Sequence, residues 1–344
     1  MRLHQVLSGA GPFDAITREA LAIRELASAW GFRGADYSVH IDPRMGRRVR
    51  PLGELSAGDV AAADTLLIHY SAYAPKLSRV LDLPGRKILL SHNVTPARWF
   101  WAHDAALALQ CALGRRELPQ FAARCDVVLG DSRFNAREIG FDRALPLVLP
   151  GIDADAPLPP EPGGPPTVLF VGRLVPHKRQ DEIIRAVALL RRHRLPDARL
   201  VLVGEPLHER YAAELTRLAD ALAPGVVTFA RSLDDAALAE RYRSAHAFLC
   251  LSEHEGFCVP LLEAFQHGVP VVARPRGAVT ETVGDAALLL DGTLDAMAEL
   301  VHFAITDAEL RTTLRERGHA RLGAYSYAHT SALLRALLEE PAST

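Results

Sequence analysis

The chain has 344 residues, of which 49% are hydrophobic and 23% are charged, and its net charge at pH 7 is −2. This length exceeds the usual size of one hydrophobic core, so we predict two domains. The near-neutral charge removes the general electrostatic argument for nucleic-acid binding and favours a small-molecule partner. The four cysteines form no C-x-x-C pair, and no signal peptide or long apolar run is present, so we expect a cytoplasmic protein with reduced thiols.

The first half of the chain alternates short apolar runs with helical periodicity, which is typical of parallel strands joined by crossover helices. The expected strands are 3–7, 65–69, 87–91, 127–131 and 144–149. A helix is expected over 14–30, because Asp14 can cap its start, apolar residues recur on one face and Gly31 can end it. This half therefore predicts an α/β domain.

Residues 150–166 are so rich in proline and glycine that neither a helix nor a strand can persist, so we place the domain linker there. The same alternation then begins again. The expected strands are 167–171, 199–203, 226–229, 247–251, 269–273 and 287–290, and the expected helices lie near 177–193, 208–223, 234–244, 259–267 and 294–320. We predict two doubly wound parallel sheets in tandem, with ligands bound beyond the carboxyl ends of their strands.

The predicted domains are residues 1–150 and 151–325, and residues 326–344 form a C-terminal segment. This segment contains an expected helix over 327–340, which lies beyond the last strand. The sequence leaves open on which domain the helix packs.

The segment SEHEGFCVPLLEA at 252–264 follows an expected strand and leads into a helix with Pro260 near its first turn. A helix start presents backbone N–H groups and a partial positive charge, so a diphosphate can bind there. The residues expected to contact it are Gly256, Phe257, Cys258 and Val259. Glu255 and Glu263 can reach a sugar hydroxyl and a ribose diol, although two glutamates at this spacing also occur by chance.

A second segment, VLFVGRLVPHKRQDEIIRAV at 168–187, is expected to form a strand, a turn and a helix. Arg173 and Lys178 follow the strand, where ligands bind in this class of sheet. Arginine offers a planar set of donors and lysine a point charge, so both suit a diphosphate. The alternative is that both are ordinary solvated basic residues.

Three further segments of the first domain are candidates for substrate contact. In SGAGPFDA at 8–15, Gly9 and Gly11 allow close approach of the backbone to a ligand, although the third glycine of a dinucleotide fingerprint is absent. In SHNVTP at 91–96, His92 directly follows an expected strand and is either a ligand contact or a histidine bonded to a neighbouring carbonyl. The aromatic run at 98–101 fits an acceptor sugar, a lipid surface or the core between helices.

Together these segments resemble the family 4 retaining glycosyltransferases, also called group 1 glycosyl transferases. The stretch 252–273 is similar to the E-x7-E region of that family, 172–178 to its G-R-x4-K segment and 91–96 to its H-x3-P segment. The stretch 277–290 is similar to the next block, with Thr280 where proline is more usual. The resemblance covers most of residues 3–292.

The resemblance implies a GT-B fold, in which two Rossmann-like domains face a central cleft. It implies transfer of a hexose from a GDP- or UDP-sugar, with retention, to a hydroxyl of a glycan or lipid-linked glycan in polysaccharide or cell-surface glycan synthesis. The first domain would bind the acceptor and the second the donor. It also implies that Arg173, Lys178, Glu255 and His92 are catalytic, with His92 contacting the donor sugar, and that Gly9 and Gly11 lie between donor phosphate and acceptor.

No cofactor and no metal are expected. The acidic pair Asp153 and Asp155 lies in the linker instead of at a strand end, and no histidines show metal-ligand spacing. The rival functions are an epimerase or phosphorylase on the same architecture and a non-catalytic sugar-nucleotide-binding protein. A peripheral contact with the inner face of the membrane is left open, and the sequence does not indicate the oligomeric state.

Overall fold

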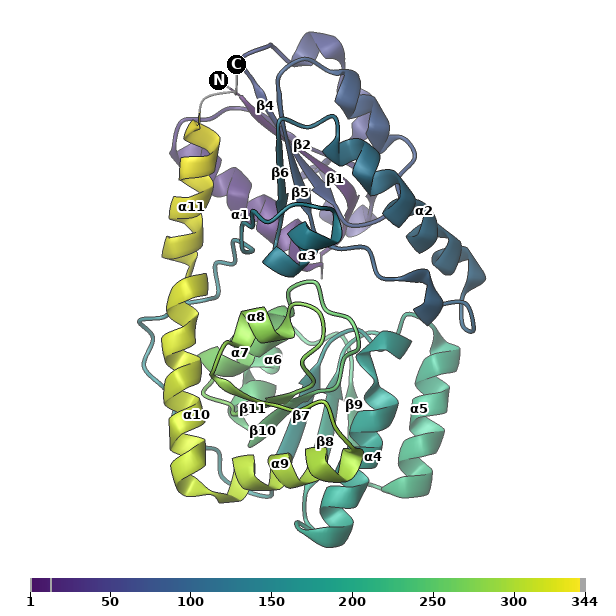
Figure 1. Cartoon of the computed structure of the whole chain (residues 1–344), viewed down its shortest axis with the longest axis vertical. Coiled ribbons are helices and arrows are strands. Elements are labelled where there is room, and N and C mark those ends of the chain that lie inside the picture. The colour runs from purple at the N-terminus through teal and green to yellow at the C-terminus, as the bar shows by residue number, and fades with distance from the viewer. Residues whose placement is uncertain (1, 13, 341–344) are drawn as a thin grey trace. The chain divides into compact units, whose positions relative to one another are not determined.

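The computed structural model describes residues 2–12 and 14–340. Residue 13, in the predicted loop 8–15, and residues 341–344, in the predicted C-terminal segment, lie outside the described residues. The chain divides into two compact units, the first made of Met1–Gly151 and Tyr325–Thr344 and the second of Ile152–Ala324 (Figure 1). We call them unit 1 and unit 2.

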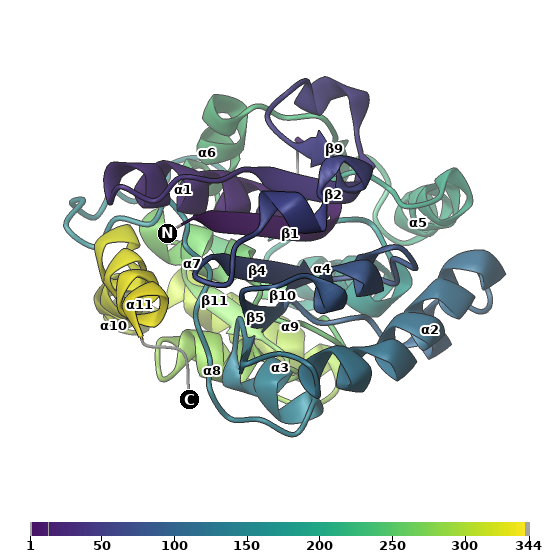
Figure 2. The same ribbon diagram turned by 90° about the horizontal axis from the view of Figure 1, so that it is seen from above.

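Unit 1 contains a six-stranded parallel sheet with the order β3-β2-β1-β4-β5-β6. Its strands are β1 (Leu3–Ala10), β2 (Asp36–Ile41), β3 (Arg50–Pro51), β4 (Thr65–Tyr70), β5 (Arg86–Ser91) and β6 (Val127–Gly130). Its α-helices are α1 (Ala15–Ala29), α2 (Ala105–Ala122), α3 (Arg133–Glu138) and α11 (Tyr327–Glu339). The strand order reverses between β1 and β4, which lie side by side near the middle of the sheet (Figure 2).

Unit 2 repeats this topology with the order β12-β11-β10-β7-β8-β9. Its strands are β7 (Thr167–Val171), β8 (Arg199–Val203), β9 (Val227–Ala230), β10 (Ala247–Cys250), β11 (Val271–Ala273) and β12 (Ala287–Leu289). Its α-helices are α4 (Gln180–His193), α5 (Glu209–Leu222), α6 (Asp235–Arg243), α7 (Val259–Gln266), α8 (Val279–Val283), α9 (Leu294–Thr306) and α10 (Ala308–Arg321). The predicted α/β class with two doubly wound parallel sheets is confirmed.

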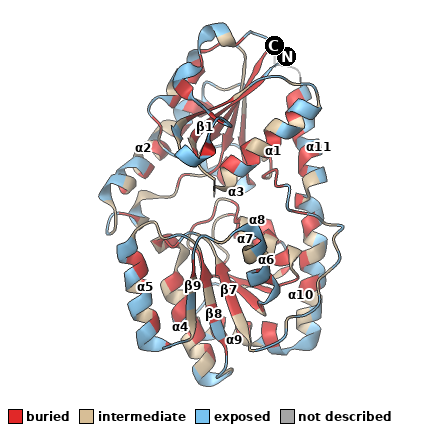
Figure 3. Cartoon of the chain, turned by 180° about the vertical axis from the view of Figure 1, so that it is seen from behind, coloured by how far each residue is buried: buried red, intermediate tan, exposed pale blue. Residues whose placement is uncertain are grey.

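Each sheet is buried between helices whose outer sides face solvent (Figure 3). The predicted signals of the first helix are present, since the Asp14 side chain accepts a hydrogen bond from the Thr17 amide and Gly31 has a φ of 88°. On the inner face of α1, Ala20, Ile23 and Ala27 are buried. Apolar periodicity thus positions this helix on the sheet.

The predicted strand at 144–149 is wrong. Only an isolated bridge between Gly130 and Ala144 forms there. Pro146 has no N–H to donate to a neighbouring strand, and the amide of Val148 donates instead to the carboxylate of Glu19 at 3.1 Å. The apolar side chains of this segment are buried without a sheet ladder.

The predicted single helix over 294–320 is two helices. Asp307 lies between α9 and α10 with extended backbone angles, and its side chain accepts a hydrogen bond from the Leu310 amide. An aspartate that caps a new helix start explains the break.

The last helix, α11, packs on unit 1. Leu334, Leu337 and Leu338 are buried in one cluster with strand residues such as Leu3 and Leu67. The Arg86 guanidinium also donates to the Leu337 carbonyl at 3.1 Å. Unit 1 is therefore completed by a segment that follows unit 2 in the chain.

Candidate functional site

The predicted basic and acidic residues of unit 2 lie at the point where its strand order reverses. Strands β7 and β10 are neighbours there, paired in parallel through Val168 and Ala247. Arg173 and Lys178 follow β7, and the loop that carries Glu255 follows β10. Because ligands of doubly wound sheets bind at such a reversal, this edge of unit 2 is the candidate site.

Lys178 and Glu255 form a close ion pair at this edge. The Lys178 Nζ lies 2.6 and 2.5 Å from the two carboxylate oxygens of Glu255, and their side chains are 18% and 5% exposed. Burial alone would lower the pKa of Lys178, but the charge of Glu255 outweighs it and raises the pKa. Lys178 is therefore held as a cation in a partly desolvated position.

The loop before α7 is fixed by backbone contacts with two other segments. The Glu253 amide donates to the His177 carbonyl at 2.8 Å, and the Ala278 amide donates to the Glu255 carbonyl at 2.9 Å. Gly277 has a φ of 60°, and a Cβ there would lie 2.3 Å from the Glu255 carbonyl oxygen. Gly277 thus permits the close backbone contact that positions Glu255. The sequence analysis did not predict this role for Gly277.

The start of α7 has the geometry expected of a helix that follows a tight turn. Cys258 precedes the helix in the left-handed region with a φ of 71°, and Pro260 lies in the first turn. The side chains of Phe257 and Cys258 are buried, whereas Gly256 and Val259 are half-buried. Gly256 and Val259 are therefore the more accessible residues of the predicted diphosphate-binding turn.

Glu263 lies in the second turn of α7, beyond the first turn in which an acidic side chain favours the helix dipole. The Tyr242 hydroxyl donates to Glu263 Oε2 at 2.8 Å. Burial and the neighbouring Glu263 raise the pKa of Tyr242 well above its ordinary value. Tyr242 was not predicted from the sequence, because a tyrosine in a helix of mixed polarity carries no special signal.

Arg173 has an exposed side chain. Within residues 2–12 and 14–340, its guanidinium makes no hydrogen bond or ion pair, while its carbonyl accepts a hydrogen bond from Gln180 at 3.0 Å. Its backbone is thus fixed and its charge is available to a ligand. Among the predicted site residues of unit 2, Lys178 and Glu255 are in contact, and Arg173 and residues 256–259 lie on the segments that follow β7 and β10. Glu263 lies farther along, in the second turn of α7.

Gly9 and Gly11 of unit 1 lie at the carboxyl end of β1. Gly9 belongs to the strand itself, which runs three residues further than the predicted 3–7, and Gly11 follows it. A Cβ on Gly9 would lie 3.9 Å from the His40 carbonyl, and one on Gly11 would lie 4.0 Å from Asp42. Packing inside unit 1 therefore does not require glycine at either position, which is compatible with close approach of a ligand.

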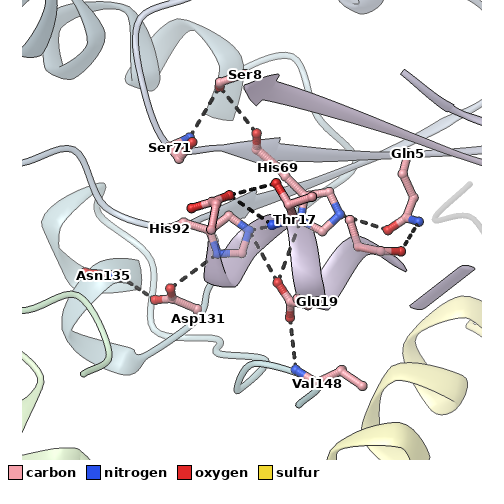
Figure 4. Close-up of polar contacts among 12 residues, drawn as sticks. Gln5, Ser8, Thr17, Glu19, His69, Ser71, His92, Asp131, Asn135 and Val148 are labelled. Carbon is pink, nitrogen blue, oxygen red and sulfur yellow. Dashed lines mark hydrogen bonds and ion pairs between the residues drawn. The ribbon is translucent and has the colours of Figure 1, made fainter. Parts of the chain in front are cut away.

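His92 belongs to a buried polar cluster of unit 1 (Figure 4). Its Nε2 lies 3.0 Å from Nδ1 of His69, and its Nδ1 lies 3.3 Å from the Asp131 carboxylate. Glu19 Oε2 lies 3.8 Å from Nδ1 of His69 and 3.7 Å from Nε2 of His92. We call Glu19, His69 and His92 the unit 1 triad.

The triad has strongly perturbed pKa values. Burial raises the pKa of Glu19 to about 7. Burial and the neighbouring His92 lower the pKa of His69 well below its ordinary value. For His92, burial acts to lower the pKa, but the Asp131 hydrogen bond and the charge of Glu19 outweigh it, so the pKa is raised.

Sequence reasoning missed Glu19 and its place in the triad. A signal was present, because Glu19 precedes Ile23 by four residues and so falls on the same, apolar face of α1. A charged residue on such a face indicates a buried partner. His69 and Tyr70 lie at the carboxyl end of β4, and both have fully buried side chains.

The aromatic run at 98–101 divides between interior and surface. Phe100 is buried, Trp101 is 54% exposed, and the Arg98 guanidinium lies 5.5 Å from the centroid of the Trp99 ring. The core alternative therefore holds for Phe100 but not for Trp101. Among the described residues, no helix combines the length and the apolar character that crossing a bilayer would require.

Comparison with known proteins finds similarity to one family of enzymes. The sequence model of the family described as "Glycosyl transferases group 1" matches residues 153–321. A GDP-mannose-dependent alpha-(1-6)-phosphatidylinositol monomannoside mannosyltransferase of Mycolicibacterium smegmatis is 33% identical over 222 residues, which cover 57% of this chain and 57% of that protein. A D-inositol 3-phosphate glycosyltransferase of Kineococcus radiotolerans is 28% identical over 328 residues, which cover 80% of this chain and 74% of that protein. The chain thus spans little more than half of the first of these relatives.

Solved structures show the same fold at low sequence identity. HepE of Anabaena, in complex with UDP and glucose, superposes with a TM-score of 0.73 at 16% identity and covers 98% of this chain and 99% of its own. WaaG, a glycosyltransferase involved in lipopolysaccharide biosynthesis, gives a TM-score of 0.73 at 15% identity. The match covers 98% of this chain and 100% of the WaaG chain. These likenesses concern the fold alone, and they confirm the predicted GT-B fold class.

Proposed function

We propose that this chain, whose residues 153–321 match the model of the group 1 glycosyl transferases, is an enzyme of that family and transfers a sugar from a nucleoside-diphosphate sugar to an acceptor hydroxyl. The observation that carries the proposal is the partly buried Lys178–Glu255 pair at the strand reversal of unit 2, together with the exposed Arg173 that follows the same strand as Lys178. Both cations follow β7, and Lys178 contacts the loop that follows the neighbouring β10 and leads into α7. The N-terminus of α7 adds a partial positive charge. The arrangement suits a bound diphosphate.

The proposed reaction breaks the bond between the anomeric carbon and the diphosphate oxygen and forms one to the acceptor oxygen on the same face of the sugar. The acceptor proton passes to the departing diphosphate, so no protein nucleophile and no metal take part in the transfer. Arg173, Lys178 and the α7 turn stabilise the negative charge that develops on the diphosphate. Glu255 orients Lys178 and contacts a sugar hydroxyl.

We propose GDP-mannose as the first donor to test, because the name of the Mycolicibacterium relative specifies it. The acceptor side is assigned to unit 1, and a glycan or lipid-linked glycan is the proposed acceptor. The phosphatidylinositol monomannoside and inositol 3-phosphate in the relatives' names favour polar lipid or inositol acceptors. The exposed Trp101 supports a peripheral contact with a membrane that holds such an acceptor.

The direct test supplies GDP-mannose, UDP-glucose and UDP-N-acetylglucosamine with phosphatidylinositol mannosides or inositol phosphate, and follows the products by mass spectrometry. We expect a glycoside with one donor, and NMR of its anomeric carbon to show retained configuration. An altered sugar nucleotide or a sugar phosphate would identify an epimerase or phosphorylase instead. Binding of donor with neither transfer nor slow donor hydrolysis would contradict the proposed activity.

Glu263 is proposed to accept hydrogen bonds from the ribose diol of the donor. In the Glu263→Gln variant, we expect the dissociation constant of GDP to rise about tenfold, because hydrogen bonds to a charged acceptor contribute about 1.5–3 kcal/mol. Isothermal titration calorimetry measures this constant. Glu240→Gln, which alters an exposed ion pair on α6, is the matched control. An unchanged GDP affinity of the Glu263 variant would overturn the ribose role.

The predicted contact between His92 and the donor sugar stays a prediction. The His92 side chain is 1% exposed, and both ring nitrogens lie close to protein atoms. A sugar hydroxyl can therefore reach the ring only if the surrounding loops move.

A further inference from the structure

Three potential ligand atoms face one another in the unit 1 triad. Nδ1 of His69, Nε2 of His92 and Oε2 of Glu19 form a triangle with sides of 3.0, 3.7 and 3.8 Å. The three side chains are at most 1% exposed. Glu19 Oε2 has no hydrogen-bond partner in the described part of the chain, although the other oxygen of this carboxylate accepts from Val148.

The outer hydrogen bonds of the two histidines fix where their protons lie. Gln5 uses its Nε2 to donate to the Ala20 carbonyl and the Asp36 carboxylate, so its Oε1 accepts from Nε2–H of His69 at 3.0 Å. The Asp131 carboxylate likewise accepts from Nδ1–H of His92. When both histidines are neutral, Nδ1 of His69 and Nε2 of His92 therefore carry no proton. Their lone pairs face each other at a nitrogen–nitrogen distance of 3.0 Å.

Such an arrangement requires a positive charge between the lone pairs. The ring planes are within 9° and the ring centroids are 5.2 Å apart, so the two rings meet edge to edge. The other charged groups that act on the triad are the carboxylates of Asp14 and Asp131, and among the interactions described no lysine or arginine contributes. The charge must come from a proton on one ring or from a metal cation.

A similar group of residues in unit 2 helps to decide between a proton and a metal cation. Cys250, Glu255 and Cys258 form the other described group close enough to hold a metal ion. There the Lys178 ammonium already lies against both carboxylate oxygens of Glu255. The unit 1 triad has ligand atoms and neighbouring carboxylates, but among the interactions described no lysine or arginine supplies a positive charge.

We propose that the unit 1 triad binds a divalent transition-metal ion, with Zn²⁺ as the favoured ion. A triangle of these dimensions has a circumscribed radius of about 2.0 Å, and zinc bonds to imidazole nitrogen and carboxylate oxygen measure about 2.0–2.2 Å. Two imidazoles and one carboxylate suit zinc, whereas Mg²⁺ and Ca²⁺ prefer oxygen ligands. Binding displaces to solvent the proton shared by the rings and requires both rings to turn toward Glu19.

The outer contacts of the triad also match those of metal-binding histidines. Such histidines almost always donate their second N–H to a carboxylate or carbonyl oxygen, as His69 does to Gln5 and His92 to Asp131. The ion would join α1, β4 and the end of β5, and it would make His92 a positioning residue for the carboxyl edge of the sheet. The ligands are at least 23 residues apart in the chain, so no short motif reveals them.

The proposal is tested on the intact protein without reference to transfer activity. The chain is unfolded in urea with a chelator and refolded with Zn²⁺, because a fully buried site exchanges slowly. After desalting, elemental analysis is expected to find one zinc per chain, and refolding with Zn²⁺ but not Mg²⁺ is expected to raise the Tm. Wild-type protein that retains no zinc and shows no Tm shift would overturn the proposal and identify a shared proton as the occupant.

Matched variants locate the ion. His69→Gln and Glu19→Gln are expected to lose the bound zinc, while His4→Asn, which alters a buried histidine of β1 outside the triad, keeps it. The Cys250→Ser/Cys258→Ser double variant is also expected to keep it. Zinc retained by both triad variants, or lost only in the cysteine variant, would overturn the assignment.

A spectroscopic measurement on the wild type does not depend on variants that fold. Refolding with Co²⁺ is expected to give weak visible bands of a nitrogen and oxygen site. An intense near-ultraviolet band from thiolate to cobalt would place the metal at Cys250 and Cys258 and overturn the proposal.

Discussion

Lys178 and Glu255 combine a structural and a chemical role, and the two roles can be separated. Lys178→Ala leaves a buried carboxylate without its partner, which we expect to lower the free energy of unfolding by about 3 kcal/mol. Turnover should fall by about 10²-fold or more, because a donor to the developing oxyanion is lost. Urea unfolding and steady-state kinetics measure the two effects.

The Lys178→Ala/Glu255→Gln double variant is the control for this interpretation. It removes the unpaired charge, so we expect it to recover most of the stability while turnover stays low. Recovery of turnover together with stability would mean that Lys178 acts only through the fold.

Gly277 provides a test of how tightly Glu255 must be held. In Gly277→Ala, the new Cβ would meet the Glu255 carbonyl at 2.3 Å, so we expect the loop to shift and donor affinity and turnover both to fall at least tenfold. Gly225→Ala is the matched control, because Gly225 also has a positive φ of 70° but nothing within 4 Å of an added Cβ. Equal effects of the two substitutions on donor binding would show that only backbone strain matters.

The sequence predicted the residues of the unit 2 site better than those of unit 1 for a physical reason. Lys178 and Glu255 lie on short loops directly after strands, so strand prediction alone brings them to one edge. Their roles rest on the resemblance and are not yet tested. The triad joins one helix to two strand ends, and only the three-dimensional register of β4 and β5 places His69 and His92 side by side.

At the scale of elements, prediction succeeded where apolar periodicity was regular and failed where another interaction decided the backbone. The strand 167–171 and the start of α1 were predicted correctly, because a buried run and a capping aspartate act locally. Strands β2 and β3 were missed. Each contains polar or charged residues, and β3 is only two residues long, so neither shows a continuous apolar run.

Helix α11 supplies a prediction at this scale. Leu334→Ala should lower the stability of unit 1 by about 2–5 kcal/mol, because Leu334 is fully buried against the sheet. Leu333→Ala, at a residue 39% exposed on the same helix, should have little effect. Hydrogen exchange of β1 and β4 peptides measures the change. Equal exchange in the two variants would contradict the packing role of this face of the helix.

At the scale of the whole molecule, the two units have separate cores and should respond to different ligands. GDP at about 100 times its dissociation constant should stabilise the native state by about 2.7 kcal/mol and slow hydrogen exchange in β7, β10 and α7. Zn²⁺ should slow exchange in β1 and β4 instead. Mg²⁺ is the control for both, and protection of unit 1 strands by GDP alone would contradict the assignment of the nucleotide site.

The return of α11 to unit 1 has a consequence for synthesis on the ribosome. Unit 2 is continuous in the chain, so its core can close as soon as residue 324 has left the exit tunnel. Unit 1 has its sheet long before then, but the apolar surface that Leu334, Leu337 and Leu338 cover stays open until these residues emerge. Unit 1 thus begins to be translated before unit 2 but is completed after it, and a chain terminated before α11 would expose that surface to chaperones and proteases.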